Sequence, residues 1–286
     1  MPIAEQKTSP ETDAVTQVTG DEPKVASQKI LHHEIVEGKD AIQRPPGRLF
    51  LSGVAGGLEI SFSLFLMGVV RTLTDGRLSP PVAELITANM YSFGFVLVIL
   101  GRSEFFTEQT SLAVLPVLNG EASVKGLLAL WVNVFAANLV GATISAGLVA
   151  ITGPSLGVIS PEALGAIAES VVNHPALAIF LSAVFAGWLM GLLSWVVAAA
   201  RDTISQIVIV WMVTSAIGLG HLHHAILGSV EVLAGLFSAR SVTLGDFGHF
   251  LLWTTLGNIV GGSLFVAILK FSHARPVEGA AARQRR

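Results

Sequence analysis

The stretch Gly101-Arg-Ser-Glu-Phe-Phe-Thr-Glu-Gln-Thr110 interrupts an apolar region that otherwise extends over residues 82–118. A second polar stretch, Gly218-Leu-Gly-His-Leu-His-His-Ala225, divides the apolar region 204–237 in the same way. Non-helical backbone at membrane depth persists only where protein or a water-filled cavity satisfies its polar groups. The sequence therefore predicts two broken membrane helices, each with a half-helix that begins inside the bilayer.

The composition places this chain in a membrane. Hydrophobic residues make up 52% and charged residues 13% of its 286 residues, whereas a typical soluble domain carries about 25% charged residues. A membrane helix needs about 20 mostly apolar residues. We predict an all-α membrane protein with six spans, at about 49–70, 82–118, 124–151, 176–200, 204–237 and 247–271.

Several functional classes are excluded by the residues that are missing. With no cysteine, the chain has no thiolate metal site, no disulfide and no cysteine nucleophile. A net charge of -3 provides no basic surface for nucleic acid. The chain lacks the nucleotide-binding, hydrolase and zinc-protease motifs that carry common enzyme chemistry. We therefore expect no enzyme activity, no catalytic residues and no cofactor.

The distribution of positive charge predicts the orientation. If the amino terminus is cytoplasmic, thirteen Lys and Arg residues lie inside and three lie outside, which agrees with the positive-inside rule. We expect a flexible cytoplasmic tail at 1–45 with at most a short helix near 30–36, a channel domain at 46–272, and a basic cytoplasmic tail at 273–286. No cleaved signal peptide is visible, and the expected location is the bacterial inner membrane with both termini inside.

An internal repeat supports the six spans. Ala137-Asn-Leu-Val-Gly-Ala142 is matched 120 residues later by Gly257-Asn-Ile-Val-Gly-Gly262. The same shift takes Glu104 in the first interruption to His224 in the second. Two units of three spans face opposite ways, so we predict inverted repeats whose second and fifth helices are broken. Half-helix amino termini that meet near the midplane favour a bound anion.

Together these motifs resemble the formate/nitrite transporter family. "SEFFTEQT" is similar to the family's loop motif, "ANLVGA" and "GNIVGG" to its two asparagine motifs, and "GLGHLHHA" stands where the family has its central histidine. The resemblance covers about 45–272. It implies an aquaporin-like six-helix protomer, a homopentamer in the lipid bilayer with one pore per protomer, and passage of a small monovalent anion such as formate or nitrite.

The resemblance also implies roles for individual residues. Phe106 and Thr107 match the loop that narrows the pore, and His223 matches the central histidine. The full set of predicted pore or substrate-binding residues is His223, His224, Phe106, Thr107, Glu104, Asn138 and Asn258.

The chain departs from the family pattern around this histidine. Leu222 replaces the preceding Glu, and His224 replaces the following Ser. Acidic residues appear instead at Glu59 and Glu231. The "GSVEVL" segment and the long amino-terminal tail are closer to the YfdC-type branch of the family.

Each singled-out polar residue also has a structural interpretation. A histidine titrates near pH 6.5, so His223 could pass a proton to a weak acid; alternatively, it binds a backbone carbonyl. His221, His223 and His224 match no zinc motif, and no metal site is predicted. Arg102 and Glu104 are expected to pair with each other or with neighbouring spans.

The two intramembrane carboxyl groups need partners or water. Glu59 has Arg102 or a histidine as candidate partners. Glu231 lies about two helical turns after His224, on the same face. Glu59 and Glu231 either form an acidic mouth together or make structural hydrogen bonds.

Three functions remain in competition. The leading prediction is a passive pore for a small monovalent anion or its protonated acid. The second keeps the fold but makes the pore proton-selective, cation-selective or restricted, through Glu59 and Glu231. The third is a membrane scaffold or sensor with a closed pore.

Overall fold

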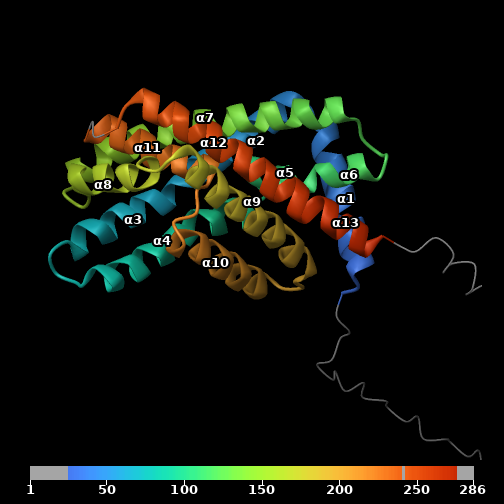
Figure 1. Cartoon of the computed structure of the whole chain (residues 1–286), viewed down its shortest axis with the longest axis horizontal. Helices are drawn as coiled ribbons and strands as arrows, with labels where there is room; N and C mark the ends of the chain where they lie inside the picture. The colour runs from blue at the N-terminus through green and yellow to red at the C-terminus, as the bar shows by residue number, and fades with distance from the viewer. Residues whose placement is uncertain (1–24, 240–241, 276–286) are drawn as a thin grey trace, which may run out of the picture.

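The structure is a computed structural model, and it describes residues 25–239 and 242–275, which form helices joined by turns and loops (Figure 1). The first half contains α1 (Ser27–Gln43), α2 (Pro46–Glu59), α3 (Ser61–Thr74), α4 (Pro80–Leu100), α5 (Phe106–Leu112), α6 (Val114–Leu118) and α7 (Val124–Ser155). The second half contains α8 (Pro161–Val172), α9 (Ala176–Ala199), α10 (Thr203–Leu219), α11 (Ala225–Ser238), α12 (Leu244–Val260), the π-helix η1 (Gly261–Ile268) and α13 (Leu269–Ala274).

Five of the described helical segments are long and apolar enough to cross a membrane. They are Pro46–Thr74, Pro80–Leu100, Val124–Ser155, Ala176–Ala199 and Leu244–Ala274. The fifth predicted span is instead made of two shorter apolar helices, α10 and α11. The second predicted span is likewise continued by the short helices α5 and α6 after its break.

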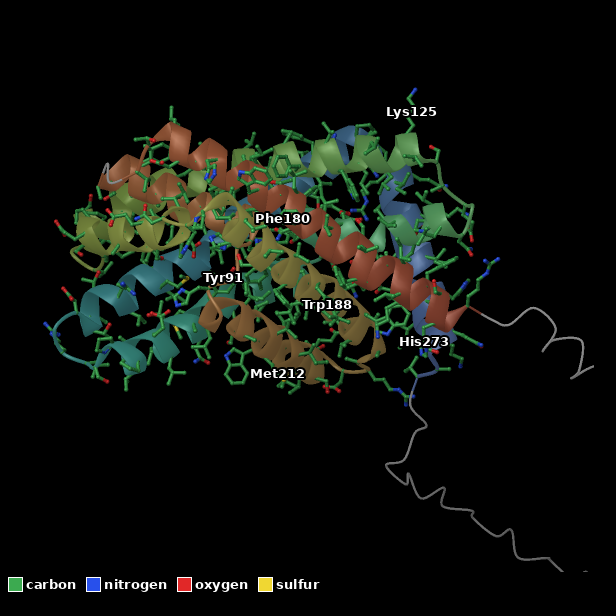
Figure 2. All side chains as sticks on the ribbon, in the orientation of Figure 1. Tyr91, Lys125, Phe180, Trp188, Met212 and His273 are labelled. Atoms are coloured by element: carbon green, nitrogen blue, oxygen red, sulfur yellow. The ribbon has the colours of Figure 1, made fainter. Side chains whose placement is uncertain are left out.

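The two halves pack in a similar way. In the first half α2 lies along α7, and in the second half α9 lies along α12. α4 and α10 lie side by side and join the two halves (Figure 1). Side chains on the outer faces of these helices, such as Met212 of α10, are exposed, whereas Tyr91 of α4 is buried in the interior (Figure 2).

The amino-terminal segment differs from its prediction. Residues expected in a flexible tail form the 17-residue helix α1, which packs against α6 and α9. Ile30, Leu31 and Ile35 are buried because their spacing puts them on one face of the helix. The prediction of a flexible tail is therefore wrong for 27–43, and the short helix expected near 30–36 is part of a longer one. Residues 1–24 lie outside the described part.

Two further segments refine the predicted boundaries. α8 fills the connection between α7 and α9 and packs against α11. It begins at the Ser160 cap, whose side chain accepts a hydrogen bond from the N–H of Ala163, and it buries Leu164 and Ile167. The last helix continues to Ala274, so most of the predicted basic tail at 273–286 lies outside the described residues.

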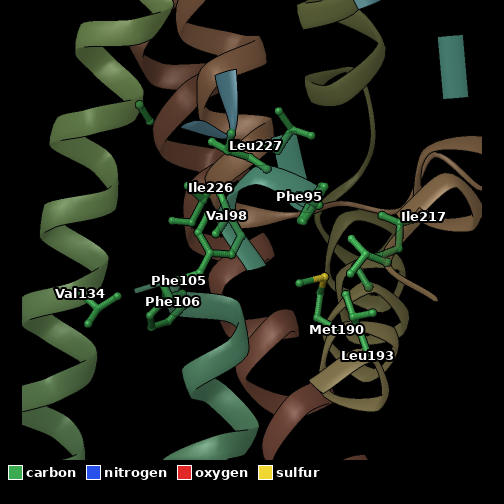
Figure 3. Packing of buried hydrophobic residues seen from close by; sticks show 14 of the residues in the cluster. Phe95, Val98, Phe105, Phe106, Val134, Met190, Leu193, Ile217, Ile226 and Leu227 are labelled. Carbon is green, nitrogen blue, oxygen red and sulfur yellow. The ribbon is translucent and has the colours of Figure 1, made fainter. Parts of the chain in front are cut away.

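The middle of the molecule is an apolar cluster in which the breaks meet. Phe95 of α4, Phe105 before α5 and Ile226 of α11 are fully buried. Figure 3 shows Phe105 and Phe106 beside Val98, with Ile226 next to them. This cluster places the start of α5 against the start of α11.

Candidate functional site

Both predicted interruptions are breaks between helices. α4 ends at Leu100 and α5 begins at Phe106, whereas α10 ends at Leu219 and α11 begins at Ala225. Among the described residues other than glycine, positive φ angles occur at Arg102 (59°) and His221 (49°), one in each break. Such angles are uncommon for residues with a Cβ. The two breaks therefore turn the chain in the same way.

Asn138 fixes the first break through backbone atoms. Its Nδ2 donates to the carbonyl oxygens of Gly53 (2.7 Å) and Glu104 (2.9 Å). Its Oδ1 accepts from the N–H of Phe106, the first residue of α5, at 2.8 Å. One fully buried side chain thus holds together α2, α7 and the start of α5.

Asn258 makes the equivalent three bonds at the second break. Its Nδ2 donates to the carbonyl oxygens of Ala183 (2.8 Å) and His223 (3.0 Å), and its Oδ1 accepts from the N–H of Ala225 at 2.9 Å. Glu104 therefore corresponds to His223, 119 residues later. The break positions are thus 119 residues apart, one fewer than the 120-residue shift of the asparagine motifs, and His224 corresponds to Phe105.

His224 joins the two breaks. Its Nε2 lies 2.8 Å from Oγ1 of Thr107, and its Nδ1 accepts a hydrogen bond from the N–H of Leu227 at 3.2 Å. Because Nδ1 is an acceptor, this hydrogen-bond pattern assigns the ring proton to Nε2, which donates to Thr107. The ring stacks on Phe105 and meets the edge of Phe95, with centroid distances of 5.4 Å and 5.1 Å.

His223 has different partners. Its Nε2 lies 2.9 Å from the carbonyl oxygen of Val171, and its Nδ1 contacts Oγ of Ser182. These bonds link the end of α8 to α9. His223 therefore binds a backbone carbonyl, as its structural interpretation expects. The histidine that contacts Thr107 is His224.

Two cavities lie at the breaks, one lined by residues around the first break and the other by residues of the second. The α1 cavity, of about 360 Å³, is lined by residues that include Glu34 of α1, Glu104 of the first break and Glu108 of α5. The α11 cavity, of about 160 Å³, is lined by residues that include His224 and Glu231. His224 lines the α11 cavity, and Glu104 and Glu108, on either side of Thr107 in the sequence, line the α1 cavity.

The α1 cavity contains two ion pairs that tie the amino-terminal region to the first break. Arg44 pairs with Glu104, and Arg102 pairs with Glu37 at 3.0 Å. Arg102 and Glu104 thus pair with residues from or just after α1, and they do not pair with each other. Gln109 also donates to the Glu104 carboxylate at 2.7 Å.

Glu34 is the buried acidic group of α1. It is 3% exposed and accepts a hydrogen bond from Ser194 of α9 at 2.7 Å. Burial raises the pKa of Glu34 to about 7, opposed by the Ser194 hydrogen bond and assisted by the nearby charge of Glu37. The sequence contained a signal for this residue, since Glu34 lies on the same helical face as Ile30 and Ile35.

The α11 cavity is lined by Glu231 and by the three histidines of the second break, His221, His223 and His224. At its mouth, Glu84 lies 3.3 Å from His221 and 3.6 Å from Arg71. Glu231 is 5% exposed, and in the described part of the chain no hydrogen bond or ion pair reaches its carboxyl group. Sequence reasoning missed Glu84 and Arg71, which nothing in their local pattern distinguished.

Glu59 is not brought together with Glu231. It lies at the end of α2 and lines neither cavity. Its Oε2 is buried without a hydrogen-bond partner in the described residues, so the expected pairing with Arg102 or a histidine is not formed. Within residues 25–239 and 242–275, no group of three His, Asp or Glu side chains is placed to hold a metal ion.

These features define a class of protein: a helical membrane protein with two broken apolar helices. The second halves of these helices, α5 and α11, begin at a common centre, and a cavity lies beside each break. The sequence model of the family described as "Formate/nitrite transporter" matches residues 28–272. The chain belongs to this family and is a multi-pass membrane protein.

Individual relatives place the chain within the family. It is 31% identical to the inner membrane protein YfdC of Escherichia coli (strain K12) over 259 residues, which cover 89% of this chain and 81% of the relative. It is 28% identical to the nitrite transporter NirC of the same organism over 225 residues, covering 78% and 82% of the two chains. The chain lies in the YfdC-like branch of the family. Members of this family are channels and transporters that carry small anions across a membrane.

Solved structures share the fold. An "FNT family ion channel" has a TM-score of 0.78 and 24% identity, and the match covers 87% of this chain and 99% of that one. A "pentameric formate channel with formate bound" has a TM-score of 0.67 and 21% identity, covering 80% and 97%. These likenesses support an aquaporin-like membrane fold.

Proposed function

We propose that this protein passes a small monovalent anion of the formate or nitrite type, or its protonated acid, through a pore in each protomer. The observation that carries this proposal is the contact between Thr107 and His224, which joins the starts of both half-helices. His224 lines the α11 cavity and Glu108, next to Thr107, lines the α1 cavity, so the proposed path between the cavities passes this contact. Two similar proteins, a nitrite transporter and a formate channel, agree with this substrate class.

The geometry suggests how an anion would be held at this contact. The Nε2–H of His224 donates to Thr107, which leaves the Thr107 hydroxyl hydrogen free to donate to an anion. The amino terminus of the 14-residue helix α11 starts beside it, and its dipole favours negative charge. Phe95 and Phe105 form apolar walls around His224. An ion would therefore shed water here and keep one or two hydrogen bonds.

The same proposal includes the architecture around the pore. The matched bonds of Asn138 and Asn258 support two inverted three-helix units. The pentameric formate channel supports a homopentamer, and the Lys and Arg distribution supports cytoplasmic termini in a bacterial inner membrane. The α1 cavity would then be the cytoplasmic entrance and the α11 cavity the outer one. Phe106, the first residue of α5, would help to narrow the path.

A second candidate function is a path for protons or small cations. It is favoured by the charges in both cavities. The α1 cavity has Glu34, Glu37, Glu104 and Glu108 against Arg44 and Arg102, and the α11 cavity has Glu84 and Glu231 against Arg71. Ionised carboxylates oppose the entry of an anion, so their protonation state determines which ions enter.

Flux into liposomes containing the purified protein tests the proposal. Formate and nitrite should enter through the unaltered protein, and Thr107→Val should slow them about tenfold or more, because a hydrogen bond to an anion contributes roughly 1.5–3 kcal/mol. Thr143→Val is the matched control, since Thr143 is exposed on α7 and bonds only its own helix. His224→Asn should slow flux more than His223→Asn.

Three outcomes would contradict the proposal. If Thr107→Val behaves like Thr143→Val, the path does not pass this contact. A reversal potential that follows the cation gradient would favour the second candidate. A complete lack of flux for all ions would favour a scaffold or sensor, and removal of residues 1–24, which leaves α1 in place, would then test a role of the tail.

A further inference from the structure

We propose that Glu231 is the proton-exchanging group of this pore: it gives its proton to a weak-acid anion in the α11 cavity, and the resulting neutral acid passes the Thr107–His224 contact. This inference rests on the proposed function and names the step that determines its substrate class. The substrates would be conjugate bases of weak acids, and anions of strong acids would be excluded.

Glu231 is placed at the cavity by the geometry of α11. His224, Gly228 and Glu231 all line the α11 cavity, and their spacing of four and then three residues puts them on one face of the helix. Gly228 lies between the two polar side chains along the helix, and it packs against the ring of Phe250. A cavity of about 160 Å³ has room for a small carboxylate and several waters, since one water needs roughly 10–15 Å³ of such volume.

Among the described residues that line the α11 cavity, no positive side chain pairs with Glu231. The other charged or titratable residues that line this cavity are Arg71, Glu84, Tyr91, His221, His223 and His224. Glu84 pairs with Arg71 and His221 at the mouth, so the positive side chain there is already engaged. An unpaired carboxylate at this depth is costly, and a carboxyl group avoids that cost by keeping its proton.

The two deeper histidines are less suited to give this proton. A second proton on His224 would sit on Nδ1 and face the N–H of Leu227, so the cap of α11 would be lost. His223 is bound to the carbonyl of Val171 through Nε2, and its Nδ1 contacts Ser182. Of the two carboxyl groups that line the cavity, Glu84 is held in ion pairs, whereas Glu231 makes no hydrogen bond or ion pair with the described residues.

The proposed step moves one proton and one charge. The O–H bond of the Glu231 carboxyl breaks, an O–H bond forms on the bound anion, and the negative charge moves from the anion to Glu231. The neutral acid then crosses the apolar contact region without a net charge. Glu231 regains a proton from water at the mouth, where the side chains of His221 and Arg71 are 58% and 41% exposed. Each cycle carries one anion and one proton together.

Formate uptake into liposomes, measured between pH 5 and pH 8 together with internal pH, tests this inference. Glu231→Gln should lower formate flux at least tenfold and remove its increase toward acid pH. Glu231→Asp should keep the pH dependence with a lower rate, because it keeps the carboxyl group. Glu59→Gln is the matched control: Glu59 is another carboxyl in an apolar helix but lines neither cavity, so its flux should match that of the unaltered protein.

The results distinguish a failure of the Glu231 inference from a failure of the proposed function. If Glu231→Gln raises formate flux or creates an anion current, Glu231 is an electrostatic barrier and the inference is wrong. An unchanged pH profile in Glu231→Gln would also overturn it. The unaltered protein gives an independent test if that variant does not assemble: formate must enter with one proton and without current, and nitrate, which does not accept a proton in this range, must stay out. If no weak acid enters at any pH, the proposed function itself has failed.

Discussion

The two helix breaks share one frame but have different surroundings. Each is held by a buried asparagine that bonds three backbone groups, and each contains one residue with a positive φ angle. At the residue before the half-helix, the first break has Phe105 and the second has His224. Phe105 provides no side-chain cap, whereas His224 caps α11 and reaches across to Thr107.

The neighbours of the two breaks differ as well. The first break is covered by α1, through the ion pairs of Arg44 with Glu104 and of Arg102 with Glu37. The second break borders a smaller cavity that contains Glu231 and opens beside His221. The shared asparagine frame therefore fixes where the half-helices begin, while the side chains that differ between the breaks determine the chemistry.

Replacing Asn138 or Asn258 should cause the largest loss of stability among the variants proposed here. Asn138→Ala and Asn258→Ala each leave three buried backbone groups without a partner, and one such group costs about 1–3 kcal/mol. We expect a loss of at least about 3 kcal/mol from each variant, measured as a lower thermal unfolding temperature in detergent. Asn133→Ala is the control on α7, because Asn133 makes one longer bond, of 3.3 Å, to Pro46. A much smaller effect at one of the two buried sites would show that the two frames are not equivalent.

Acidity should strengthen the docking of α1 at the first break only. The folded-state pKa of Glu34 is raised from 4.5 to about 7, so docking favours the protonated carboxyl. Below about pH 4.5 Glu34 is protonated whether α1 is docked or free, and the contribution of Glu34 to docking has its full strength. This contribution weakens as pH rises from 4.5 to 7, and above about pH 7 it is lost completely, a change on the order of 3 kcal/mol.

Hydrogen exchange of the α1 amides at pH 5 and pH 8 measures this effect, once the intrinsic pH dependence of exchange is corrected. Protection should be greater at pH 5. Glu34→Gln should remove the difference, because an amide carries the same charge at both values. Equal protection of the unaltered helix at both pH values would contradict the assignment.

Smaller losses are expected where the helices approach most closely. A Cβ at Gly57 would overlap the carbonyl oxygen of Asn138, and a Cβ at Gly187 would overlap that of Asn258. Gly57→Ala and Gly187→Ala should therefore each cost about 1–3 kcal/mol through overpacking. Gly147→Ala is the control, since no atom lies within 4 Å of its added Cβ, and it should leave stability equal or higher. Thermal unfolding in detergent measures these stability losses, and we expect Gly57→Ala and Gly187→Ala to lose equal amounts.

The sequence was sufficient to predict the breaks but not the residue at their centre. Charged residues and glycines inside apolar regions marked 101–110 and 218–225, because such residues are unfavourable in a membrane helix without a reason. The resemblance to the family then led to His223 as the central histidine. The breaks are 119 residues apart, and only the backbone bonds of Asn258, to His223 on one side and Ala225 on the other, show that His224 occupies the cap.

Helix α1 shows another limit of sequence reasoning. Its charged residues made the segment look like a tail, and its apolar face is short. The contacts that hold it are specific and distant, such as Ser194 with Glu34 and Glu104 with Arg44. No local pattern indicates that residues so far apart in sequence will meet.

The asparagine bonds have a consequence for how such proteins diversify. Asn138 and Asn258 hold the chain on both sides of Phe105 and His224 without touching either side chain through these bonds. Selection could therefore exchange the group at either place and alter what the protein admits, while the surrounding helices keep their positions. A related chain that keeps both asparagines would retain the architecture and still be free to acquire another solute.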